Sequence, residues 1–158
     1  MTPRLRDVVV EQRNLVLRLV DRVETAPTRP AVGRLRKIVL AQIVAEETVL
    51  LPLMEGTSVG ASYGGEHHAL LRFVLERICA PEASRADREA RLRVLRDLLV
   101  HQLERDEHMT LDRLTDEIGE RAASAAARRL AKALESADDP PASQVVGIRM
   151  EEARRTGR

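Results

Sequence analysis

The sequence predicts an all-α protein: an antiparallel, up-down bundle of four helices, followed by an additional C-terminal helix and a tail. Apolar residues recur at offsets of three, four and seven along four stretches of the chain, which is the spacing of one helical face. Segments rich in Pro, Gly or Ser separate these stretches. A polar residue interrupts the apolar face of each stretch, so four converging faces predict one polar layer across the middle of the bundle.

The first helix is expected over residues 3–24 and the second over residues 31–55. Gln12 lies at the centre of the first apolar stripe, and Gln42 and Glu46 lie one turn apart on the second. Pro52 predicts a kink or an early stop in the last turn of the second helix. The two stripes are Leu5, Val8, Val9, Leu15, Val16, Leu19 and Val23, and Leu35, Ile38, Val39, Val49, Leu50 and Leu53.

The third helix is expected over residues 65–79, where His67 faces the core. The fourth is expected over residues 85–118, with Gln102 and Asp106 one turn apart on its apolar face. Ser84 and Asp87, just before and inside its first turn, resemble a capping box. The apolar residues around these positions are Leu70, Leu71, Val74, Leu75 and Ile78 in the third helix, and Leu95, Leu98, Leu99 and Met109 in the fourth.

A competing register of the fourth helix would turn His101 inward in place of Gln102. That register places His101 on the side opposite the apolar stripe. We therefore expect Gln102 and Asp106 to face the bundle axis, and His101 and Arg105 to lie at the helix flank or in solvent. His68 and His108 are likewise expected at an edge of the bundle or on a polar face.

The expected domain organisation is a bundle over residues 1–118 and a C-terminal region over residues 119–158. An Ala-rich stretch predicts a further helix over residues 120–137 that packs on the bundle or on a partner. The last stretch carries several apolar residues, which predicts docking on this bundle or formation of a homo-oligomer. These residues are Val145, Val146, Ile148 and Met150.

Composition excludes several classes of partner. The 26 basic and 25 acidic residues balance to a net charge of +1 and alternate along the helix surfaces, as on a solvated face. Tyr63 and Phe73 are the only aromatic residues, so a stacking surface for nucleic acid is not expected. No apolar stretch reaches the roughly 18 residues of a membrane span and no leader opens the chain, which predicts a cytoplasmic protein without membrane contacts.

The buried polar positions need partners. Burying a neutral polar group without a hydrogen bond costs about 2 to 7 kcal/mol, and a charge costs more. The amides, carboxylates and imidazole of the predicted layer must therefore meet each other, a metal ion or a small molecule. This requirement makes the layer the candidate functional site.

The order of the helices and polar positions resembles the hemerythrin-like family of HHE cation-binding domains. The resemblance covers about residues 6–115. Its best-matching stretch is AQIVAEETVLLPLME, residues 41–55, which is similar to the second helix of the family. Glu66-His67-His68 and the sequence LDRL at residues 111–114 also fit. In that family the first and third helices each supply a His, and the second and fourth each supply a His with a Glu four residues later.

The resemblance implies a remodelled metal site. It aligns Gln12, Gln42 and Gln102 with three of the family's His positions. Glu46 and Asp106 keep the two carboxylate positions, and His67 alone keeps an imidazole. A di-iron centre that binds dioxygen needs several imidazole nitrogens, whereas a Gln carboxamide is a weak oxygen ligand. Reversible dioxygen carriage is therefore not expected, although an all-α, hemerythrin-like bundle is.

Several functions stay open for this layer. One divalent ion, iron or manganese, can be held by Glu46, His67 and Asp106, with oxygens of Gln12, Gln42 and Gln102 completing the shell. A small molecule can occupy the same pocket, and haem can take His67 or His68 as its axial ligand. If the site is catalytic, Glu46 or Asp106 is the natural general base.

Alternatively, the polar side chains of the layer pair and hydrogen-bond with one another, without a metal. An imidazolium at His67 would then lie between the Glu46 and Asp106 carboxylates, with Gln amides donating to the remaining oxygens. In that case the chain would be a regulatory or interaction module, and the layer would only set the register of the helices.

Overall fold

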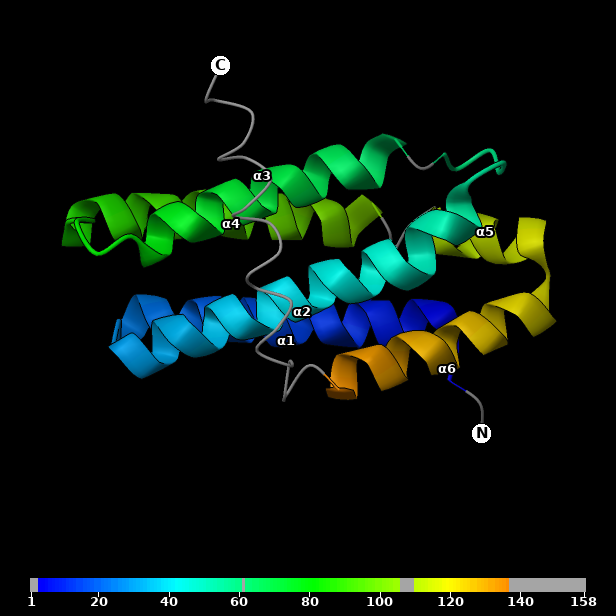
Figure 1. Cartoon of the computed structure of the whole chain (residues 1–158), viewed down its shortest axis with the longest axis horizontal. Helices are drawn as coiled ribbons and strands as arrows, with labels where there is room; N and C mark the ends of the chain where they lie inside the picture. The colour runs from blue at the N-terminus through cyan, green and yellow to red at the C-terminus, as the bar shows by residue number, and fades with distance from the viewer. Residues whose placement is uncertain (1–2, 61, 106–109, 137–158) are drawn as a thin grey trace, which may run out of the picture.

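The computed structural model of the chain describes residues 3–60, 62–105 and 110–136, and these residues are helical almost throughout (Figure 1). This confirms the all-α prediction. The helices are α1 (Leu5–Thr25), α2 (Arg29–Met54), α3 (Ser62–Cys79), α4 (Arg85–Arg105), α5 (Leu111–Ile118) and α6 (Glu120–Ser136). No helix within these ranges combines the length and apolar character needed to cross a bilayer.

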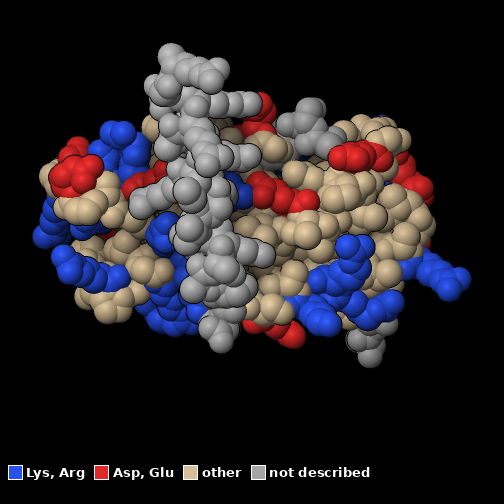
Figure 2. Space-filling model, in the orientation of Figure 1, with Lys and Arg blue, Asp and Glu red and all other residues tan. Residues whose placement is uncertain are grey.

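The four long helices α1 to α4 lie lengthwise beside one another (Figure 1). Contacts join α1 to α2, α2 to α3, α3 to α4 and α4 back to α1, so the helices enclose a common interior. The helix α6 packs along α1 and α2, and α5 packs against α6 and α1. Basic and acidic side chains both occur across the face of the molecule that Figure 2 shows.

The apolar interior is divided into two clusters. The first apolar cluster is built from α1, α2, α3 and α4, and the second from α1, α2, α5 and α6. Along α1, Val9 belongs to the second cluster and Val16 to the first. The residue between them that faces inward is Arg13. Polar side chains therefore separate the two halves of the core.

Local signals explain several helix ends. Thr28 caps α2, because its hydroxyl accepts a hydrogen bond from the Ala31 N–H at 3.3 Å. The Ser84 hydroxyl accepts from the Asp87 N–H at 3.1 Å, which agrees with the capping expected at the start of α4. Gly119 has φ of 85°, a conformation that favours glycine, and it separates α5 from α6.

The second helix agrees with its expected range, since α2 continues past Pro52 to Met54. One expected boundary is wrong. The helix α3 begins at Ser62, within the Gly- and Ser-containing segment that was expected to be a loop. The single helix expected over residues 85–118 is described as α4 and α5, with residues 106–109 outside the described ranges. The expected partner contacts of residues 137–158 also lie outside those ranges.

Candidate functional site

Six polar or charged side chains are buried within the described part of the chain, and we call them the polar layer. They come from α1, α2, α3 and α4, the four helices that were expected to supply the site. The members are Arg13, Gln42, Glu46, His67, His68 and Gln102. Two of them, Arg13 and His68, were not expected in the core.

Arg13 occupies the inward position of α1 that was predicted for Gln12. Only 2% of Arg13 is exposed, whereas Gln12 is half-buried at the flank of the helix. The buried residues Leu5, Val9, Arg13, Val16 and Val20 follow offsets of four, four, three and four, which is the repeat of one helical face. The prediction for Gln12 was wrong by one residue. A buried arginine is costly without a counter-charge, and the carboxylate that compensates Arg13 lies on another helix, so the sequence of the first helix alone did not reveal it.

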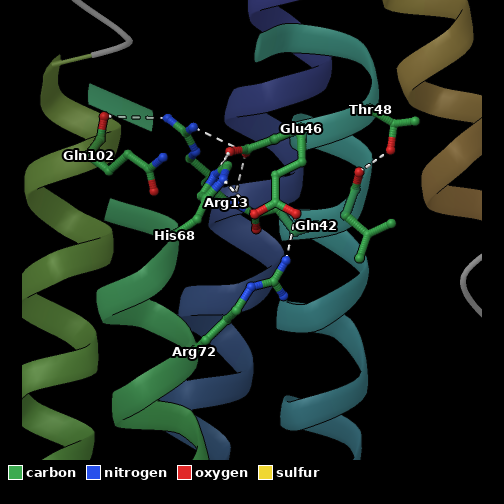
Figure 3. Close-up of polar contacts among 9 residues, drawn as sticks. Arg13, Gln42, Glu46, Thr48, His68, Arg72 and Gln102 are labelled. Carbon is green, nitrogen blue, oxygen red and sulfur yellow. Dashed lines mark hydrogen bonds and ion pairs between the residues drawn. The ribbon is translucent and has the colours of Figure 1, made fainter. Parts of the chain in front are cut away.

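The Arg13 guanidinium connects three helices (Figure 3). Its Nη2 donates to Oε1 of Glu46 on α2 at 3.1 Å, and both side chains are almost completely buried. Its Nη1 donates to the main-chain carbonyl of Gln102 on α4 at 3.4 Å. A buried guanidinium is thus held by a carboxylate on one side and a backbone oxygen on the other.

Glu46 is the acceptor at the centre of the polar layer. Besides Arg13, its Oε1 accepts from Nε2 of Gln42 at 3.0 Å, and its Oε2 lies 2.8 Å from Nε2 of His68. Burial alone would raise the pKa of the Glu46 carboxyl, but the charge of Arg13 and the contacts with His68 and Gln42 lower it from 4.5 to about 2. Glu46 is therefore ionised at neutral pH and is a weak general base.

His68 lies in the core and not at an edge, so that expectation was wrong. Only 2% of it is exposed, and its ring lies between two carboxylates: Nε2 is 2.8 Å from Glu46 and Nδ1 is 3.5 Å from Glu47. Glu47 in turn pairs with Arg72, and this pair is about one-third exposed. A row of alternating acidic and basic groups thus runs from the surface at Arg72 to the centre at Arg13 (Figure 3).

His67 is buried as expected, but it is not the cation of the layer. Burial, the neighbouring His68 and the charge of Arg13 lower its pKa, although a hydrogen bond with Gln102 and the charge of Glu46 act in the opposite direction. The neutral imidazole is therefore favoured at His67. The position between two carboxylates that was expected for His67 is occupied by His68, whose ring lies between Glu46 and Glu47.

The register predicted for the fourth helix is confirmed where the chain is described. Gln102 is buried, His101 is exposed and Arg105 is half-buried at the flank. Gln42 on α2 is also buried, as expected. Asp106 and His108 lie outside the described residues, so the predicted carboxylate of this helix and that histidine have no described position.

The donor set of the polar layer does not fit a di-iron centre. The oxygens of Glu46 are engaged by Arg13, Gln42 and His68, and the guanidinium supplies the positive charge that a metal ion would supply. A divalent cation placed beside Glu46 would be repelled by Arg13, which lies 3.1 Å from the carboxylate. Among residues 3–60, 62–105 and 110–136, no group of three or more His, Cys, Asp or Glu side chains is arranged to hold a metal ion.

His68 is not placed to be an axial haem ligand. An axial histidine must direct a ring nitrogen at the iron. The two ring nitrogens of His68 face the carboxylates of Glu46 and Glu47 instead, at 2.8 and 3.5 Å.

A cavity of about 310 Å³ adjoins the polar layer on the side of α5. Its polar wall includes Arg13, Glu46, His68, Gln102 and Arg105, together with Thr110. Its apolar lining includes Leu50, Leu51, Met54, Val59 and Leu111. Of the residues predicted for the ligand pocket, His68 and Gln102 line this cavity, whereas Gln12 and Gln42 are not part of its described lining.

Arg105 was expected only as a flanking residue, yet it brings a second guanidinium to the cavity. Burial and the positive charge of Arg13 lower the pKa of Arg105. Helical periodicity had indicated that Arg105 lies one step from the core, but it could not reveal that Arg13 of another helix faces the same space.

Comparison of the chain with protein-family models, with curated protein sequences and with solved structures finds no match.

Proposed function

We propose that the chain is a hemerythrin-like four-helix bundle that binds a small organic molecule in the cavity beside its polar layer, and that ion pairs take the place of the metal. The observation that carries this proposal is the buried Arg13–Glu46 pair at one wall of the cavity. It places a guanidinium where the resemblance implies a metal site. The pairing of α1 to α4 around a common interior supports the bundle.

The composition of the cavity supports binding of a small molecule. Ligand sites are typically concave and mostly apolar, with a few polar groups that fix orientation, and they span roughly 300 to 1,000 Å³. A volume of about 310 Å³ suits a small ligand. The polar groups that would orient it are themselves held by neighbours, since Arg13 and His68 both contact Glu46. Because these side chains are already held in place, a bound ligand restricts their motion little further, and binding costs little side-chain entropy.

Three probes of matched length test the proposed function: hexan-1-ol, hexanoate and hexylamine, each followed by ligand-detected NMR. We expect saturable binding of at least one of them. Leu51→Trp should abolish it, because Leu51 lines the cavity and a larger side chain would fill it.

Leu53→Trp is the matched control. Leu53 is half-buried on the same helix and is not part of the cavity lining. Its variant should bind the probes like the wild type. If no probe binds the wild-type protein, or if both variants bind unchanged, the proposed function is wrong.

A further inference from the structure

We infer that the outward face of α3 is the contact surface of a homodimer, in which the α3 helices of two copies of this chain pack antiparallel about a twofold axis. The inference goes beyond the proposed function, since it does not involve the cavity. Two observations carry it. Exposed apolar side chains follow one another along α3, and charges of opposite sign lie on either side of them.

The apolar side chains of this face are large and exposed. Phe73 is the only Phe of the chain, yet 59% of it is exposed. Leu70, on the preceding turn of the same helix, is 52% exposed. A single exposed apolar residue is common on a protein surface, but adjoining ones on one helix face are typical of an interaction site.

Charged residues flank this apolar pair at equal spacing. Glu66 lies four residues before Leu70 and Arg77 lies four residues after Phe73, and both charged residues are exposed. The successive offsets of four, three and four place all four side chains on one face of the helix. We call these four residues the α3 stripe.

The α3 stripe is complementary to itself when it is turned end for end. With a twofold axis between positions 70 and 73 of an antiparallel pair, Leu70 of one copy lies opposite Phe73 of the other copy. Glu66 of each copy then lies opposite Arg77 of the other. The two ion pairs would enclose an apolar centre, which is the common arrangement of a polar rim around an apolar interface core. A parallel pair would place like charges together.

The α3 stripe is also accessible and partly ordered in advance. Among the described helices, the main contacts of α3 are with α2 and α4, and the exposure of Leu70 and Phe73 shows that these side chains face away from both. The guanidinium carbon of Arg77 lies 5.6 Å from the centroid of the Phe73 ring, a favourable cation–π contact. Aromatic residues near the centre of an interface often contribute most to its affinity.

Sedimentation velocity at concentrations up to about 1 mM tests the homodimer. A contact along one pair of helices is small by the standard of stable complexes, so we expect a reversible equilibrium between monomer and dimer. Phe73→Asp should abolish the dimer, because it places a charge at the apolar centre. Since Phe73 is more than half exposed, this variant should melt close to the wild type when both proteins are dilute and monomeric.

Reversal of charge tests the antiparallel packing. Glu66→Arg and Arg77→Glu should each weaken the dimer about fivefold or more, because each turns both ion pairs into contacts between like charges. The double variant Glu66→Arg/Arg77→Glu should recover the wild-type affinity. An equimolar mixture of the two single variants should form a mixed dimer that is tighter than the dimer of either variant. The controls are Glu11→Arg and Arg18→Glu, the same reversals at exposed positions of α1, which should dimerise like the wild type.

Several outcomes would overturn the inference. A wild-type protein that stays monomeric up to about 1 mM refutes the homodimer. A dimer that persists in Phe73→Asp forms through another surface, such as the C-terminal stretch, and also refutes it. If the single charge reversals leave the dimer unchanged, or if the double variant does not restore it, the antiparallel packing of α3 is refuted. These results leave the proposed function untouched, because ligand binding in the cavity is measured separately.

Discussion

Arg13 is a costly residue to bury, and its surroundings show how the cost is met. Its guanidinium reaches Glu46 at 3.1 Å and the Gln102 carbonyl at 3.4 Å. The attraction within a buried ion pair is largely offset by the loss of hydration, so the pair adds little net stability by comparison with apolar side chains. Removal of one partner is much more harmful than removal of both, because it leaves a single buried charge.

The first prediction follows from this asymmetry. Arg13→Met should lower the free energy of unfolding by about 3 to 5 kcal/mol, because it leaves the Glu46 carboxylate buried without its cation. The double variant Arg13→Met/Glu46→Met should recover most of that loss. Urea unfolding of the wild type, both single variants and the double variant measures the coupling between the two residues.

Arg6→Met supplies the control for this cycle. Arg6 lies two turns earlier on α1 and pairs with Asp112 at the surface, so its loss should cost at most about 1 kcal/mol. If Arg13→Met is no more destabilising than Arg6→Met, Arg13 does not occupy the core. Gln12→Met should also have a small effect, because Gln12 lies at the flank.

The second prediction concerns the dependence of the protein's stability on pH. Because the folded protein lowers the pKa of Glu46 from 4.5 to about 2, the stabilisation from this group is complete above pH 4.5 and is lost as the pH falls from 4.5 to about 2. A shift of one pKa unit is worth about 1.4 kcal/mol, so the free energy of unfolding should fall by about 3 kcal/mol across this pH range.

Urea titrations at several pH values within this window measure the effect. The double variant Arg13→Met/Glu46→Met lacks the group and should lose correspondingly less stability than the wild type as the pH falls. Other carboxyls titrate equally in both proteins, so their contribution cancels. Parallel stability curves for the two proteins would refute the lowered pKa of Glu46.

At the scale of elements, the sequence predicted which segments are helical better than which side chains face inward. Apolar spacing located the long helices, and Ser84 marked the start of α4. The register of α1 was wrong by one residue, because the partner that makes a buried Arg13 tolerable is distant in sequence. His68 was misplaced for the same reason, since Glu46 and Glu47 on another helix hold it.

The third prediction concerns α6, which forms part of the second apolar cluster. Leu130→Ala should destabilise the protein by about 2 to 5 kcal/mol, because Leu130 is almost completely buried in that cluster and its loss leaves a cavity. Leu134→Ala, the same substitution one turn later at a half-buried position, should cost less. Thermal and urea unfolding of both variants test this difference, and equal small losses would show that α6 does not stabilise the bundle.

At the scale of the whole molecule, the polar layer lies between two apolar clusters and ties four helices together. A layer of this kind across the middle of the bundle could be predicted, because each helix carries a polar residue on its apolar face. Its chemistry could not, because a Gln, a Glu and a His at these positions suit a metal, a ligand or a hydrogen-bond network equally well. Arg13 supports the proposed ion-paired layer over a metal site, and only the packing of α1 against α2 and α4 reveals its position.

The most direct test of the ion-paired polar layer is the metal content and melting temperature of the wild-type protein. The protein is purified from iron-supplemented cells and measured with and without a chelator. The account predicts less than one metal ion per chain, no oxo-bridge absorption and the same melting temperature in both conditions, because Arg13 supplies the positive charge beside Glu46. Two irons per chain with oxo-bridge absorption, or a melting temperature that falls in chelator, would contradict it.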